Sequence, residues 1–197
     1  MNIKLFKVVF FCFFICNAFS TSSVEARTIT LEGKGSYFLS TNHRFRSIYG
    51  GAGLYRIETN IQIWNDLYAW ANAGYMYASG DSSRGNHTHL HLVPVSGGVS
   101  YFWKVGSVSP YVGVGPILAY SHISNHATGV TRNQDGFGGG FVVKTGANFY
   151  FYQSLFVDVF TDYSFIRVAY HHSDKRTTHH KGDLSGFNFG LGLGYRF

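Results

Sequence analysis

The chain closes with the stretch Phe187-Asn-Phe-Gly-Leu-Gly-Leu-Gly-Tyr-Arg-Phe197, in which every second residue is large and apolar. The residues between are Asn, Gly or Arg. Because successive side chains of a β-strand point to opposite faces, this pattern predicts a strand with one apolar face and one face of small or polar residues. Soluble domains usually end in frayed polar segments, so we expect this strand to be paired on both sides and its apolar face to meet an apolar medium.

The composition of the whole chain agrees with extended structure. Of its 197 residues, 18% are aromatic and only 13% are charged, with 24 Gly and 3 Pro. This length suits one domain of ordinary size, and the chain is too apolar to be disordered. The net charge of +6 is only mildly basic, and we expect no nucleic-acid partner.

Residues 1–26 predict a secretory signal peptide. Lys4 and Lys7 precede an unbroken apolar stretch, and a segment of small and polar residues ends at Ala26. We expect cleavage after Ala26, with Ala18 and Ser20 as the alternative positions. Both cysteines lie in this segment, so we expect no disulfide in the exported part, residues 27–197.

A period of two dominates residues 27–197 and predicts eight strands. They are expected at about 27–39, 47–64, 67–79, 89–104, 109–121, 138–152, 155–170 and 185–197. Tight turns alternate with longer loops, the loops at about 40–46, 80–88, 122–137 and 171–184. This alternation is typical of outer-membrane barrels, and most of the strands exceed the ~9–11 residues that a tilted membrane strand needs. We therefore predict an all-β fold, an eight-stranded antiparallel up-and-down transmembrane β-barrel with both termini on the periplasmic side.

The residues expected to face the lumen distinguish this barrel from a soluble one. In a soluble barrel such as a lipocalin, the apolar residues of each strand face inward. The row expected to face the lumen is rich in Gly, Asn and Ser and carries balanced charges. These are Glu32, Glu58, Asp158 and Asp162 against Lys34, Arg56, Lys144 and Arg196. Because unpaired buried charges are costly, we expect ion-pair networks that plug the lumen, with a small gated pore as the alternative.

The signal segment, the eight strands and the ending Leu191, Leu193, Tyr195 and Phe197 together resemble small outer-membrane β-barrels of the OmpA transmembrane-domain and OmpX type. The resemblance covers 27–197 at the level of architecture. It implies a monomer in the outer membrane of a Gram-negative bacterium, surrounded by lipid and lipopolysaccharide. It also implies that the terminal residues are a signal for the barrel-assembly machinery. Such barrels include adhesins, structural proteins and enzymes, so activity must be argued from the site.

The histidines gather on the long-loop side. They are His43, His87, His89, His91, His122, His126, His171, His172, His179 and His180. The first cluster, 87–91, has its imidazoles at i, i+2 and i+4, on one face of an extended chain. These imidazoles and those of the pairs His171-His172 and His179-His180 are candidate ligands that can share zinc or copper or change charge between pH 5 and 7. The alternative is that exposed loops tolerate any polar residue; no other cofactor is expected.

A second group of residues could attack an ester. His122 and Ser124 share a strand face and Asp135 lies across the hairpin, which is the composition of a Ser-His-acid set. The segment is similar to the His-x-Ser-Asn motif of the eight-stranded lipid A 3-O-deacylases (PagL family), which implies catalytic roles for His122, Ser124 and Asp135 and an oxyanion role for Asn125. It departs from that family in its Asp, where the family has Glu, and in lying between strands five and six instead of in the last hairpin.

From these patterns we predict a non-enzymatic outer-membrane barrel whose four His-rich loops serve surface contact, adhesion to a host or surface ligand, or envelope integrity. The alternatives are a lipid A-modifying esterase and a metal-binding or pH-responsive barrel.

Overall fold

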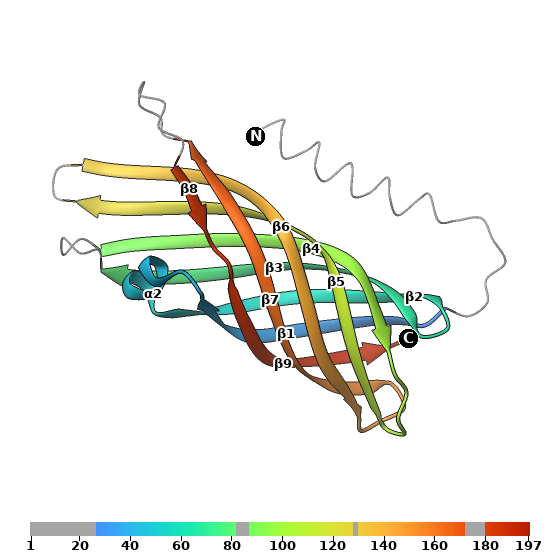
Figure 1. The fold of residues 1–197 in the computed structure, drawn as a ribbon. Helices are drawn as coiled ribbons and strands as arrows, with labels where there is room; N and C mark the ends of the chain where they lie inside the picture. The colour runs from blue at the N-terminus through green and yellow to red at the C-terminus, as the bar shows by residue number, and fades with distance from the viewer. Residues whose placement is uncertain (1–26, 82–86, 128–129, 172–179) are drawn as a thin grey trace.

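The computed structural model describes residues 27–81, 87–127, 130–171 and 180–197 (Figure 1). The predicted signal segment, 1–26, and the predicted ligands His172 and His179 lie outside these residues. The elements are β1 (Ile29–Ser40), α2 (His43–Tyr49), β2 (Gly51–Trp64), β3 (Leu67–Asp81), β4 (His87–Phe102), β5 (Val108–Ala127), β6 (Val130–Tyr150), β7 (Leu155–His171), β8 (His180–Asp183) and β9 (Gly186–Arg196).

The sheet is antiparallel throughout and closes on itself, as predicted. Its order is β6-β5-β4-β3-β2-β1-β9-β7, and β6 also pairs with β7. The first and last long strands meet in a register that runs from Thr30 opposite Arg196 to Ser40 opposite Gly186. The short β8 pairs with β7 only and extends the line of β9 along it. The fold is therefore a closed eight-stranded up-and-down barrel with one extra strand, and closure pairs each of the eight long strands on both sides.

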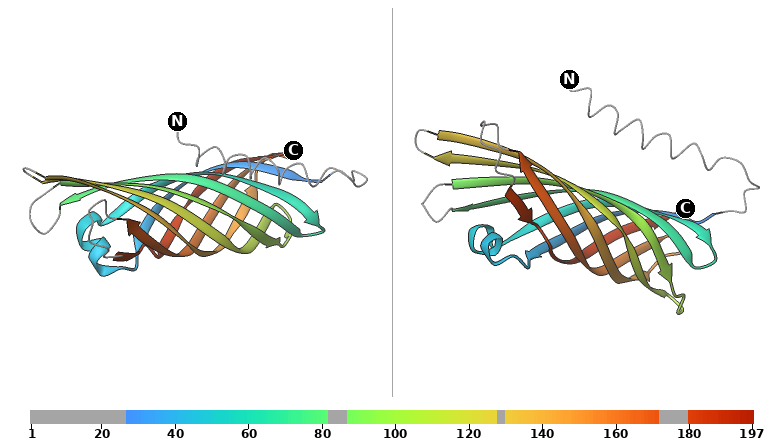
Figure 2. Two further views of the ribbon diagram at one scale, coloured as in Figure 1. Left: turned by 90° about the horizontal axis from the view of Figure 1, so that it is seen from above. Right: turned by 45° about the horizontal axis from the view of Figure 1, so that its top comes forward.

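The two ends of the barrel differ. One end, the tight-turn end, carries the connections β2–β3, β4–β5 and β6–β7 together with Ile29 and Arg196, where β1 begins and β9 ends (Figure 1). Two of its turns contain residues with positive φ, Asn65 at 43° and Gly106 at 61°, a conformation that Asn and Gly adopt more easily than other residues. The opposite end, the long-loop end, carries α2, β8 and the long β5–β6 hairpin (Figure 2).

The side chains of the closing strand, β9, point alternately outward and inward, as its sequence predicts. The side chains of Phe187, Phe189, Leu191, Leu193 and Tyr195 point outward and are 44–60% exposed. Asn188, one position out of phase with them, is buried inside the barrel. Each of the other long strands also presents large apolar residues outward. In water such a surface would be unfavourable, so the wall is built to meet an apolar medium.

Two predicted boundaries were wrong at the long-loop end. The second strand was expected from residue 47, but helix α2 occupies 43–49 and β2 begins at Gly51. Phe45 and Tyr49 have helical i, i+4 spacing, and their tilted rings pack with centroids 4.9 Å apart. Gly50, with φ of 64°, ends the helix.

The expected loop at 122–137 is largely strand. β5 continues to Ala127 and β6 starts at Val130, so the pair forms a long hairpin at this end of the barrel (Figure 2). β4 stays paired with β5 as far as Thr88 opposite Asn125, whereas β7 ends opposite Asp135 of β6. Unbroken pairing from Val108 opposite Phe149 to Ala127 opposite Val130 holds the hairpin together.

Among the described residues, no helix is long and apolar enough to span a bilayer.

The inside of the barrel is layered along its axis. The half near the long-loop end is filled by an apolar cluster that includes Phe38, Leu54, Met76, Leu92 and Ile166. The prediction of a mainly polar inward row was therefore wrong for this half. A charged layer lies in the middle, and an open cavity lies at the tight-turn end.

Candidate functional site

The charged layer is centred on the Lys34 ammonium. Its Nζ lies 2.9 Å from Asp158 Oδ2, 3.1 Å from Glu58 Oε1 and 3.3 Å from Glu32 Oε2. Tyr111 donates its hydroxyl to the same Asp158 oxygen at 2.8 Å. These side chains come from β1, β2, β5 and β7, so the contacts tie strands on opposite sides of the barrel.

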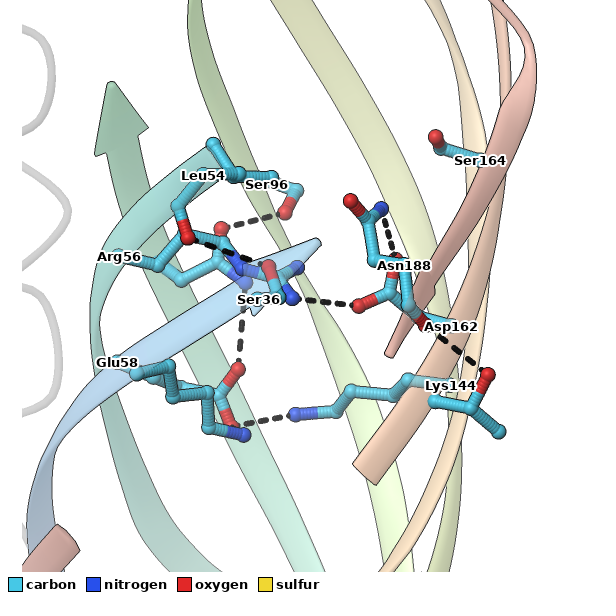
Figure 3. A network of polar contacts seen from close by, with 12 residues as sticks. Ser36, Leu54, Arg56, Glu58, Ser96, Lys144, Asp162, Ser164 and Asn188 are labelled. Carbon is cyan, nitrogen blue, oxygen red and sulfur yellow. Dashed lines mark hydrogen bonds and ion pairs between the residues drawn. The ribbon is translucent and has the colours of Figure 1, made fainter. Parts of the chain in front are cut away.

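Glu58 links this centre to a second cation. Its Oε1 lies 2.7 Å from Lys144 Nζ, and its Oε2 accepts a hydrogen bond of 3.2 Å from the Asn72 amide (Figure 3). The Lys144 ammonium also lies 4.1 Å from the centre of the Trp70 ring. This carboxylate is therefore the hub of the layer, in contact with two buried ammonium groups.

A third cation completes the layer on the side of the apolar cluster. Arg56 Nη2 lies 2.7 Å from Asp162 Oδ2, and Asn188 Nδ2 donates a hydrogen bond of 2.6 Å to Asp162 Oδ1 (Figure 3). The free space around this pair is only about 20 Å³, room for roughly one water. The described side chains therefore seal the lumen at this level.

Seven of the eight side chains predicted for the lumen lie in this layer, and Arg196 does not. Its guanidinium donates to the Gln153 carbonyl at 2.8 Å and lies 4.8 Å from the Tyr150 ring, at the tight-turn end. As the last residue of β9, it lies at the mouth, where water can hydrate the charge. The expected balance of charges is thus replaced by four carboxylates facing three cations.

The side chains of the predicted Ser-His-Asp set meet on the outer face of the β5–β6 hairpin. His122 Nδ1 lies 2.7 Å from Asp135 Oδ1, and Ser124 Oγ lies 3.4 Å from His122 Nε2. Tyr120 donates to the same Asp135 oxygen at 2.7 Å. Asn125, the residue with the predicted oxyanion role, is described for its backbone only.

Cross-strand register explains this geometry. His122 and Asp135 are direct partners in the β5–β6 ladder, and Ser124 is two residues along β5 on the same face. The hydrogen bonds from His122 and from Tyr120 lower the pKa of Asp135. An ionised carboxylate at Nδ1, with a hydroxyl facing Nε2, orients the imidazole as a base for that hydroxyl.

The clustered histidines pair with tyrosines of β3. Tyr75 hydroxyl lies 2.7 Å from His91 Nδ1, and Tyr77 hydroxyl lies 2.7 Å from His89 Nδ1. The His91 and His122 rings are 6.4 Å apart, centre to centre.

Among the side chains that the structure describes, no three His, Cys, Asp or Glu residues are grouped to hold a metal. The side chains of His87, His171 and His180 are outside that set. The metal site thus stays a prediction, and it fails if the purified barrel takes up neither zinc nor copper at micromolar levels by calorimetry.

Sequence reasoning did not include several contacts of these sites. Tyr111 was not predicted as a site residue, although its inward position follows from the alternation with the outward residues Val112 and Val114. The hydroxyl contacts of Tyr75 and Tyr77 depend on the β3–β4 register, which a single strand's sequence does not show.

The architecture is that of the small eight-stranded outer-membrane β-barrels. Neisserial surface protein A is 16% identical, with a TM-score of 0.56 over 89% of this chain and 100% of that one. OprG from Pseudomonas aeruginosa is 10% identical, with a TM-score of 0.65 over 87% and 96%. Ail, the attachment invasion locus protein of Yersinia pestis, is 15% identical, with a TM-score of 0.54 over 87% and 97%, in a complex with the heparin analogue sucrose octasulfate. No family model and no curated protein matches the chain.

Proposed function

We propose that the chain is a monomeric, non-enzymatic outer-membrane barrel of a Gram-negative bacterium, with its long-loop end at the cell surface. The outward apolar wall supports insertion in lipid, because water would be an unfavourable neighbour for it. Short turns of such barrels face the periplasm and longer connections face outward. The likeness to outer-membrane barrels supports the same location.

The sealed lumen is the observation that carries this proposal. Contacts of 2.7–3.3 Å join Lys34, Lys144 and Arg56 to four carboxylates across the barrel. A lumen closed in this way cannot pass solutes as a wide porin does. The barrel then serves as a rigid support, and its contacts with a host surface, a ligand or lipopolysaccharide are made at the long-loop end.

The test separates the rim from the barrel body. Residues 122–135 are replaced by a short turn, and the variant is compared with wild type for assembly in the outer membrane, cell-surface attachment and detergent resistance of the cells. We expect normal assembly with loss of attachment or resistance. A variant that assembles and keeps both properties would contradict the proposal, as would a large steady conductance of the wild-type barrel in planar bilayers.

A second candidate is an esterase acting on acyl chains in the outer leaflet, and the contacts of Ser124, His122 and Asp135 favour it. In such a reaction Ser124 Oγ would attack the ester carbonyl while His122 Nε2 takes the hydroxyl proton. His122 would return that proton to the departing alcohol, and water would then hydrolyse the acyl-serine. The outward face of the hairpin would bring lipid A esters to these groups.

Mass spectrometry of lipid A distinguishes the two candidates. An esterase would remove an ester-linked chain when wild type is expressed, Ser124→Ala would leave lipid A intact, and His43→Ala, on helix α2, would serve as a matched rim control. Lipid A that keeps all its chains with wild type would exclude the esterase and leave the scaffold proposal standing.

A further inference from the structure

The tight-turn end contains a cavity of about 730 Å³, within the size range of ligand sites. It lies on the far side of the charged layer from the apolar cluster, and it opens between the turns. Its lining includes Asn60, Asn148, Tyr68, Phe102 and Arg196. None of these residues has a role in the proposed contact at the opposite end of the barrel.

Two buried amide oxygens lack a hydrogen-bond donor. Asn60 Oδ1 and Asn148 Oδ1 have no partner among the described residues, although the two residues are only 3% and 4% exposed. The Asn60 amide is fixed in orientation, because its Nδ2 donates to Thr30 Oγ1 at 3.1 Å and to Glu58 Oε1 at 3.4 Å. Its oxygen is therefore the unsatisfied end. A buried acceptor without a donor is costly, so both oxygens call for a ligand that carries O–H or N–H groups.

The walls of the cavity are aromatic. The Tyr68 and Phe102 rings pack edge to face with centroids 4.8 Å apart, and the Arg196 guanidinium covers Tyr150 at 4.8 Å. Flat apolar walls around a few polar groups suit a ligand with an apolar face and a polar edge. A pyranose ring has both, with C–H groups on its faces and hydroxyl donors on its edge.

We propose that this cavity binds a saccharide unit, whose hydroxyl groups donate to Asn60 and Asn148 and whose C–H face lies on the aromatic wall. The binding chemistry is independent of the proposed rim function. In the orientation proposed above, the cavity faces the periplasm, where the sugar could be the end of a cell-wall glycan or a free oligosaccharide.

The test is an NMR titration of the full-length exported chain, residues 27–197, folded in an amine-oxide detergent that has no sugar headgroup. The probes are chitotriose, which resembles cell-wall glycan, and maltotriose. We expect saturable shifts of the Asn60 and Asn148 side-chain amides at millimolar sugar. A response to chitotriose alone points to cell-wall glycan as the source, and a response to both points to free oligosaccharides as well.

Three variants make the result specific. Asn148→Ala should weaken binding about tenfold, the effect of losing one hydrogen bond at a buried site. Phe102→Leu should also weaken it, because it keeps apolar bulk but removes the flat ring. Ser121→Ala, a polar truncation in the opposite half of the barrel, should bind like wild type. Absence of saturable shifts with either sugar, or unchanged affinity in both cavity variants, would show that the cavity holds water only and overturn the proposal.

Discussion

Removing the hub carboxylate tests the charged layer most directly. In Glu58→Leu, the Lys144 ammonium loses its contact of 2.7 Å and Lys34 loses one of three carboxylate contacts. Lys34 keeps Glu32 and Asp158, at 3.3 and 2.9 Å. The Lys144 side chain is only 5% exposed, so its charge remains buried without the carboxylate.

The expected loss is about 3–5 kcal/mol in free energy of unfolding, the usual cost of removing one partner from a buried ion pair. The Trp70 ring, 4.1 Å from the ammonium, offsets part of this loss, by up to about 2 kcal/mol for a desolvated cation–π contact. The assay is equilibrium urea unfolding in phospholipid vesicles, followed by tryptophan fluorescence and by the gel mobility of the folded form.

The matched control is the double variant Glu58→Leu/Lys144→Met, which removes both charges. It should recover most of the stability, because an apolar replacement of a buried pair is often neutral or stabilising. A loss below about 1 kcal/mol in the single variant, or a double variant no more stable than the single one, would refute the view that these charges are stabilised by direct pairing.

Three further predictions concern assembly, pH and packing. Deleting Phe197 should impair membrane assembly far more than His43→Ala does, as measured by the folded fraction in outer-membrane extracts, and equal assembly would contradict a role for this residue in the assembly signal. The pKa of Asp135 is lowered in the folded protein, so its hydrogen bonds contribute to stability above the ordinary carboxyl pKa of 3.8. This contribution is lost as the pH falls through the lowered pKa. NMR shifts of the Asp135 carboxyl carbon should follow the loss, and Asp135→Asn should show no such change. Gly98→Ala should destabilise the barrel by about 1–3 kcal/mol, because its Cβ would lie 2.1 Å from a backbone carbonyl oxygen of β5, whereas the outward Gly33→Ala meets nothing within 4 Å and should unfold like wild type in urea.

The barrel was predictable because one rule, the period of two, acts on every strand. The row from Phe187 to Phe197 alternates without exception, so its outward face followed directly. The same rule failed where both faces are apolar. In the stretch 75–78, Met76 is fully buried between outward Tyr75 and Tyr77, and nothing in the alternation separates an apolar lumen from a lipid-facing wall.

The candidate sites were predictable only in part, because their contacts join different strands. Two-residue spacing placed His122 and Ser124 on one face, and Asp135 was expected across the hairpin. The cavity at the tight-turn end could not be predicted, because Asn60 and Asn148 come from β2 and β6, which do not pair and line the same cavity only in the closed barrel. Helix α2 was not predicted because it has only seven residues, and one apolar pair at i, i+4, Phe45 and Tyr49, is weak evidence for a helix. The period of two in the strand that follows is a much stronger pattern.

The same alternation that fills the lumen also places chemical groups outside it. Along β5, Ser121 points inward, while Tyr120 and His122 point outward. With 20 and 21 residues, β5 and β6 are about twice the length that a membrane crossing requires. The excess lies at the long-loop end. Inside the barrel, the charged groups already contact one another and are closed off from solutes. Groups able to meet a ligand are therefore concentrated at the two ends, on the long hairpin and in the cavity between the tight turns.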